Sequence, residues 1–170
     1  MRARGTTLGA VCGMLFFLGS MPSGATDTLA DLQARFDRET SGVHKAKLLG
    51  KLGDAQFEEA RRASKAGEYE AVGLTLEKYR DNVRSAIEAL KKQHPDAEKQ
   101  SNGYRQLQMH VHKAIREVDD TLIVSPEDYK PPLQLVRQDL VDLDDELLKL
   151  LFPRRPLNLL ESSPPPEKQP

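Results

Sequence analysis

The chain has 170 residues, of which 38% are hydrophobic and 5% aromatic, with no tryptophan and a formal net charge of −1. Balanced charge leaves no basic face of the kind that nucleic-acid binding needs, so no nucleic-acid partner is predicted. The shortage of aromatic side chains argues against a stacking site for bases or sugars.

The first 25 residues have the order of features typical of a secretory signal peptide. Arg2 and Arg4 provide a positive start, an apolar or small-residue run covers 8–18, and small residues lead up to Ala25. Because a membrane-spanning helix needs about 17–25 apolar residues, this run predicts cleavage rather than an anchor. We expect cleavage between Ala25 and Thr26, and a mature chain in the periplasm or outside the cell with no membrane span.

Cleavage would also change the chemistry of the chain. It would remove Cys12, which is the only cysteine, and three of the four methionines, leaving Met109. Without Arg2 and Arg4 the mature chain carries 23 basic and 26 acidic side chains. Covalent haem attachment and disulfide bonds both require cysteine, so no cofactor is predicted and the fold must be stable by packing alone.

Apolar residues spaced three and four apart predict helices through most of the mature chain. Thr28 and Asp31 resemble a capping box that begins a short first helix ending near Glu39. Gly67 is typical of a helix C-terminus and separates the second predicted helix from the third. The long helices are predicted at 43–66, 68–93, about 104–122 and 133–151.

The third of these helices has the clearest seam, which runs without a slip through Tyr69, Val72, Leu76, Tyr79, Val83, Ala86 and Leu90. The last long helix is the richest in leucine, so we expect it to be the most buried. Gly50 and Gly53 each lower helix propensity by about 1 kcal/mol relative to alanine. They suit a place where a neighbouring helix approaches closely.

Four long helices with short connections predict an all-α, up-down-up-down four-helix bundle over residues 26–152. The short N-terminal helix is expected across one end or groove, and an extended coiled-coil hairpin that dimerises is the alternative. Residues 153–170 hold six of the eleven prolines and are predicted to be a disordered C-terminal tail.

His110 and His112 are the candidate histidine ligands for a metal ion, and both are weak candidates. Helical residues two apart point to nearly opposite sides, so the two imidazoles cannot share one metal ion. We expect His110 to flank the core seam, His112 to face water, and both to be solvated. The Glu-x-x-His pairs of di-iron bundles and the EF-hand loop are absent.

The last long helix carries a cluster of acidic residues, none of which falls on its apolar seam: Asp139, Asp142, Asp144, Asp145 and Glu146. We expect them to form an exposed acidic face. Its predicted counterparts are basic residues of the third helix, namely Arg80, Arg84, Lys91 and Lys92.

No nucleophile motif, catalytic cysteine or phosphate-binding loop is present, so the chain is not expected to be an enzyme. Our hypothesis is an exported helical bundle that acts through contacts with a protein partner, or with itself, in the cell envelope. A periplasmic chaperone is a narrower version, although Leu-Thr-x-x-Gln repeats are lacking. The alternative is a small-ligand or metal carrier that uses His110, His112 and the acidic cluster.

A short apolar stretch interrupts the polar tail just after Arg154 and Arg155. It contains Leu157, Leu159 and Leu160. Two interpretations stand: the stretch docks on a partner or on the bundle, or it is a solvent-exposed part of a linker.

Overall fold

A computed structural model describes residues 27–153, which form five α-helices and one short 3₁₀ helix and contain no β-strand. The predicted all-helical fold is confirmed. The predicted signal peptide, its cleavage site between Ala25 and Thr26, and the tail with Leu157, Leu159 and Leu160 lie outside the described residues.

Helix α1 (Leu29–Arg38) begins at the predicted capping box. The Thr28 hydroxyl accepts a hydrogen bond from the backbone N–H of Asp31 at 3.2 Å, and the Asp31 carboxylate accepts one from the backbone N–H of Thr28 at 3.3 Å. A helix start leaves backbone N–H groups without intrahelical partners, so this exchange stabilises the first turn.

Helices α2 (Gly42–Ala66) and α3 (Tyr69–Gln93) form the tight hairpin that Gly67 predicts. Gly67 has φ of 77°, a left-handed conformation that glycine adopts without a Cβ clash. The backbone N–H of Glu68 donates to the carbonyl of Ala63 at 2.9 Å, which closes the end of α2. The chain therefore reverses direction within a few residues.

Helix α4 (Ser101–Val124) begins two residues before Gly103, and a 3₁₀ helix, η1 (Glu127–Tyr129), leads directly into α5 (Lys130–Leu151). Pro131 and Pro132 lie inside the first turn of α5 rather than before it. Proline is tolerated there because the N–H groups of a first turn have no intrahelical acceptor.

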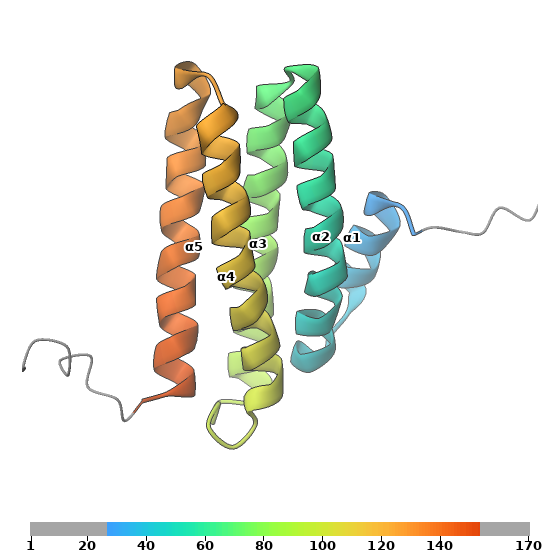
Figure 1. The fold of residues 1–170 in the computed structure, drawn as a ribbon. Coiled ribbons are helices and arrows are strands. Elements are labelled where there is room, and N and C mark those ends of the chain that lie inside the picture. Colours follow the sequence, from blue (N-terminus) through green and yellow to red (C-terminus); the bar gives the residue numbers. More distant parts are fainter. Residues whose placement is uncertain (1–26, 154–170) are drawn as a thin grey trace, which may run out of the picture.

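The four long helices alternate in direction, as the up-down-up-down prediction requires (Figure 1). Helix α2 lies against α3 and α4, and α5 lies against α4 and α3, whereas α2 and α5 do not touch. The parallel helices α2 and α4 are therefore neighbours, and so are the parallel helices α3 and α5. The connection from α3 to α4 passes across one end of the bundle (Figure 1).

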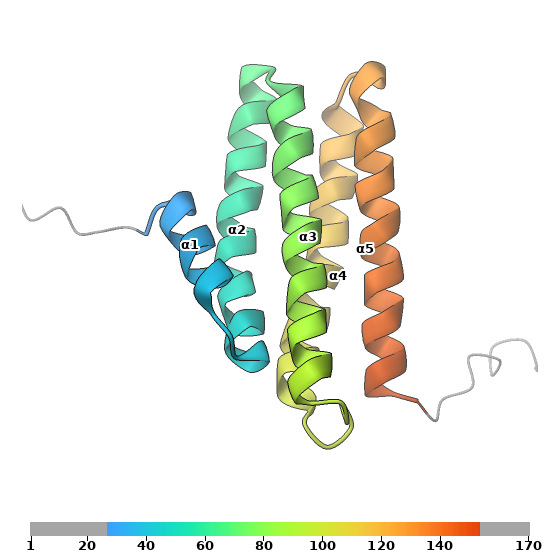
Figure 2. The same ribbon diagram turned by 180° about the vertical axis from the view of Figure 1, so that it is seen from behind.

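Helix α1 packs along α2 on the side away from α4 and α5 (Figures 1 and 2). Its Leu32 and Phe36 join the core. Lys45 of α2 is buried beneath it, and its ammonium group donates to the carbonyls of Phe36 at 2.9 Å and Glu39 at 3.3 Å. These bonds satisfy carbonyls at the end of α1 and fasten it to α2.

One continuous core contains side chains from all five α-helices. The prediction that the last helix would be the most buried is wrong, because Leu135 is 67% exposed and Leu148 is 37% exposed. Helix α5 lies at the edge of the bundle, where, within residues 27–153, α3, α4 and η1 contact it. Helix α2 is covered by α1, α3 and α4 instead.

Candidate functional site

His110 of α4 belongs to a polar network inside the bundle. Its Nδ1 lies 2.8 Å from the hydroxyl of Tyr79 on α3, and its Nε2 lies 3.1 Å from the backbone carbonyl of Gly50 on α2. The imidazole is only 12% exposed, so the prediction of a solvated His110 is wrong. The physical reason is that α2 runs beside α4 and covers the flank on which His110 lies.

The partners of His110 define its protonation. The Gly50 carbonyl can only accept a hydrogen bond, so Nε2 carries the proton and Nδ1 accepts from Tyr79. Burial lowers the pKa of His110 below its ordinary value, although the Asp54 carboxylate, 3.6 Å from Nε2, opposes the shift. Burial also raises the pKa of Tyr79 well above its ordinary value. Because its pKa is lowered, the imidazole of His110 is neutral at neutral pH.

Glycine at position 53 makes room for this network. A Cβ atom at Gly53 would lie 2.4 Å from His110 Cε1 and 2.7 Å from Tyr79 Cε2, whereas one at Gly50 would lie 3.8 Å from His110 Cδ2. Phe57, one turn further along α2, stacks on the imidazole with ring centroids 5.9 Å apart. The close approach expected at these glycines is confirmed at Gly53.

His112 faces the other side of α4, toward α5. It is 56% exposed, and its Nδ1 lies 3.6 Å from the carboxylate of Asp144. The amide of Gln108 donates to the same carboxylate at 3.0 Å. Asp144 is 8% exposed, so the predicted exposed acidic face fails at this residue, which packs against α4. His110 and His112 are not brought together.

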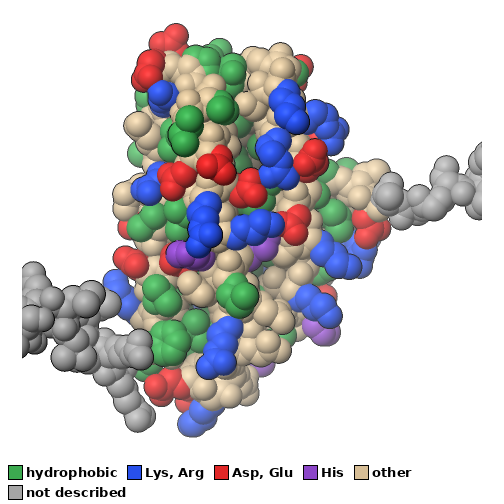
Figure 3. Space-filling model, viewed as in Figure 1, with side chains coloured by type: hydrophobic (Ala, Val, Ile, Leu, Met, Phe, Trp, Pro, Cys, Tyr) green, Lys and Arg blue, Asp and Glu red, His purple; other side chains and the backbone are tan. Residues whose placement is uncertain are grey.

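The other acidic residues of α5 behave largely as predicted. Asp139 lies 3.1 Å from Arg80 and 3.0 Å from Arg84 of α3, and Glu146 pairs with Lys91. Figure 3 shows side chains of both signs interspersed on the opposite face, where α4 lies. The more exposed pairs, Arg84–Asp139 and Lys91–Glu146, contribute about 0–1 kcal/mol each. The pairs do not form a charged cavity.

Two further features of the described residues bear on the predicted chemistry. Within 27–153, no group of three or more His, Cys, Asp or Glu side chains is arranged to hold a metal ion. In the same part of the chain, no helix has the length and apolar character needed to cross a membrane.

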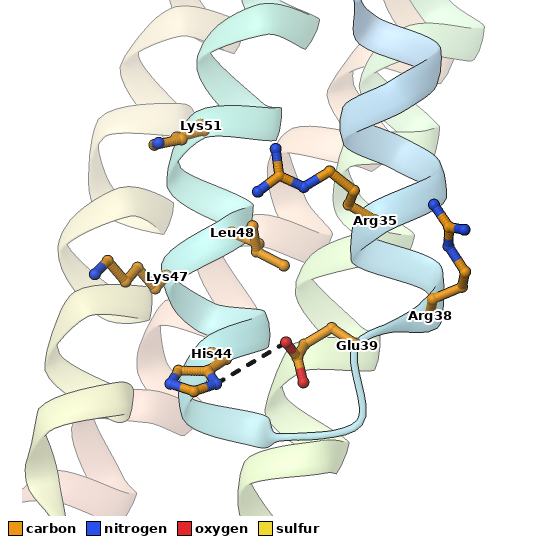
Figure 4. Close-up of a pocket in the computed structure, with 7 residues that line it drawn as sticks. All are labelled: Arg35, Arg38, Glu39, His44, Lys47, Leu48 and Lys51. Atoms are coloured by element: carbon orange, nitrogen blue, oxygen red, sulfur yellow. Dashed lines mark ion pairs between the residues drawn. The ribbon is translucent and has the colours of Figure 1, made fainter. Parts of the chain in front are cut away.

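A basic depression of about 550 Å³ separates α1 from α2 near the start of α2. Its charges do not converge on one point. In Figure 4, Arg35 extends toward α2, whereas Lys47 and Lys51 extend over the far side of α2 and Arg38 points away from the depression. Arg35 is also paired with Asp27 at 2.8 Å. The depression therefore lacks the geometry of an anion site.

A second groove, of about 540 Å³, lies between α1 and α3 with α2 as its floor. We call it the α1–α3 groove. Leu29 of α1 and Leu74 of α3 line its walls, and Leu74 is 63% exposed. A reciprocal pair of amide hydrogen bonds joins Gln33, which also lines the groove, to Asn82 of α3.

Gln56 lines the α1–α3 groove from α2 and is 2% exposed. Its Oε1 is the one buried side-chain nitrogen or oxygen atom in residues 27–153 that has no hydrogen-bond partner. A buried acceptor left unsatisfied costs about 1–3 kcal/mol, so it calls for an explanation. Sequence reasoning missed this residue, although a signal was present: Gln56 lies between Leu52 and Ala60 in an otherwise apolar stripe.

Compared with protein-family models, curated proteins and solved structures, the chain matches none. Its function is therefore inferred from its own residues.

Proposed function

We propose that this protein is exported and acts, without catalysing a reaction, by binding another protein through the α1–α3 groove. The order of charge, apolar run and small residues before Thr26 supports export. The unsatisfied Oε1 of Gln56 in a groove with an exposed leucine wall is the observation that carries the binding proposal. A chaperone is a narrower form of the same proposal.

The groove defines the chemistry of the partner. Leu29 and Leu74 offer apolar walls to an aliphatic side chain. Gln56 offers an acceptor to a backbone or side-chain N–H once its amide turns toward the groove. At the rim, Lys78 is exposed and Glu59 pairs with Arg62 at 3.2 Å. A short amphipathic segment of a partner protein meets these requirements.

The test is site-specific photo-crosslinking in the native envelope. A photoreactive residue replaces Lys78 at the rim of the groove, and the crosslinked product is identified by mass spectrometry. We expect one reproducible protein adduct. Leu74→Glu should abolish it, because a carboxylate cannot be buried against Leu29 without a large desolvation cost.

Ile123→Glu is the matched control, because Ile123 is an aliphatic residue that is 78% exposed and lies outside the groove. The adduct should survive this change. An adduct lost equally in both variants, or no adduct above background in the unmodified chain, would contradict the proposal. Adducts between two copies of the chain would indicate self-association through the same groove.

Export and cleavage of the signal peptide are tested by a separate measurement. N-terminal sequencing of the protein recovered from the envelope should begin at Thr26. A chain that retains Arg2 and Arg4 would contradict cleavage.

A carrier of small molecules is the second candidate, because about 540 Å³ falls within the range of about 300–1,000 Å³ typical of ligand pockets. Native mass spectrometry of the chain purified from its envelope distinguishes the carrier from the protein-binding function. A stoichiometric small molecule, lost in Leu74→Glu, would favour the carrier. A stoichiometric metal ion would favour the metal version instead.

A further inference from the structure

A further concave feature lies at the opposite end of the bundle from the α2–α3 turn. It is a pocket of about 400 Å³ between the α3–α4 connection and the last turn of α5, and we call it the end pocket. Its apolar lining consists of Pro95, Ala97, Leu150 and Pro153. Ala97 is 3% exposed and Leu150 is half-buried, so the pocket continues directly from the core.

The position of Pro153 indicates which segment occupies the end pocket. Pro153 lines the end pocket and is also the last described residue, so the chain leaves the bundle from the wall of the pocket itself. Leu157 follows four residues later. At about 3.3–3.6 Å per residue, this linker reaches at most about 14 Å. The apolar stretch is therefore tethered close to an apolar pocket at a high effective concentration.

The charges around the end pocket are compatible with the same occupant. Arg154 and Arg155 immediately precede the apolar stretch, and the rim of the end pocket carries Asp96 and Glu98. Lys149 is the one basic residue of the lining. Asp96 is paired with Lys99 at 3.0 Å, so the acidic excess of the lining is small. The stronger match is between the leucines of the tail and the apolar residues of the pocket.

We propose that Leu157, Leu159 and Leu160 fold back onto their own bundle and occupy the end pocket. This intramolecular contact holds the α3–α4 connection against the end of α5. It concerns a different surface from the α1–α3 groove and does not depend on the partner binding proposed above; the tests below use the exported chain.

The absence of tryptophan from the chain makes a direct test available. Leu159→Trp places a single indole in the apolar stretch, and Ser163→Trp places one in the same tail beyond it. In the otherwise unchanged exported chain, we expect the emission of Leu159→Trp to be blue-shifted and less quenched by acrylamide than that of Ser163→Trp. The difference should not change with protein concentration. Equal emission and equal quenching would overturn the proposal.

A disulfide trap keeps the test independent of any packing change that tryptophan introduces. The only cysteine, Cys12, precedes the predicted cleavage site, so introduced pairs are unambiguous in the exported chain. Pro95→Cys with Leu159→Cys should form an intramolecular disulfide at a higher rate than Pro95→Cys with Ser163→Cys. Equal rates for the two pairs, or disulfides formed only between chains, would overturn the proposal.

Discussion

Replacing Gly53 by alanine tests whether the His110 network constrains α2. The new Cβ atom would lie 2.4 Å from His110 Cε1 and 2.7 Å from Tyr79 Cε2, which is closer than carbon atoms approach in folded proteins. Neither ring can move freely, because Tyr79 is fully buried and His110 is hydrogen-bonded on both nitrogens. One ring must shift, and at least one of these hydrogen bonds must lengthen.

Three contributions set the size of the effect. Overpacking a buried site costs about 1–3 kcal/mol, and each hydrogen bond that is lost costs about 0.5–1.5 kcal/mol. Alanine gains about 1 kcal/mol of helix propensity over glycine, which opposes both costs. We therefore expect Gly53→Ala to lower the free energy of unfolding by about 2 kcal/mol.

Gly50→Ala is the matched control, three residues away on the same helix. Its Cβ atom would lie 3.8 Å from His110 Cδ2, which is an ordinary van der Waals contact. This variant should keep the network and gain up to about 1 kcal/mol from helix propensity. Both substitutions replace glycine by alanine, yet the free energy of unfolding is expected to fall for Gly53→Ala and to rise for Gly50→Ala.

The assay is urea unfolding followed by far-ultraviolet circular dichroism, with the two variants and the parent chain compared at pH 7.5. The unfolding midpoint should fall for Gly53→Ala and rise or stay constant for Gly50→Ala. If Gly53→Ala is as stable as the parent chain, or if both variants lose the same stability, the inferred constraint is wrong.

Three more measurements follow from the described contacts. Because burial keeps the folded-state pKa of His110 below its unfolded value of about 6.5, the unfolded chain binds a proton first, and the free energy of unfolding should fall as pH drops below about 6.5. His110→Gln should lose this part of the pH dependence in urea titrations, whereas His112→Gln should retain it. Gln56→Met removes the unsatisfied acceptor and should raise the free energy of unfolding by about 1 kcal/mol in thermal unfolding; a loss would contradict the packing described. Lys45→Met removes two hydrogen bonds to the end of α1, so hydrogen exchange should speed up across residues 29–38 while α3 keeps its protection; unchanged exchange in α1 would contradict the role of Lys45.

Part of the candidate site could be foreseen. The sequence identified Gly50 and Gly53 as close-approach positions and placed His110 and His112 on different sides of one helix, because both inferences need only the helical period. It also marked Arg80 and Arg84 as partners of the acidic cluster, and this pairing is confirmed for Asp139. Gln56 was open to the same reasoning and was missed.

The burial of His110 and Asp144 could not be foreseen in this way. Both flank an apolar seam, and a flank is exposed or covered according to which helix lies beside it. Local periodicity carries no information about neighbours. Helix α2 covers His110, and α4 covers Asp144, because α4 lies between α2 and α5 around the bundle.

The amino-acid pattern alone was enough to place the five helices, the capping box at Thr28 and the reversal at Gly67. Each of these depends on interactions between residues close together in the chain. The pairing of α2 with α4, the groove between α1 and α3 and the end pocket at Pro153 were decided only by tertiary packing. They arise where segments distant in sequence pack together or leave a gap between them. Which segments pack together depends on the free energy of the whole core.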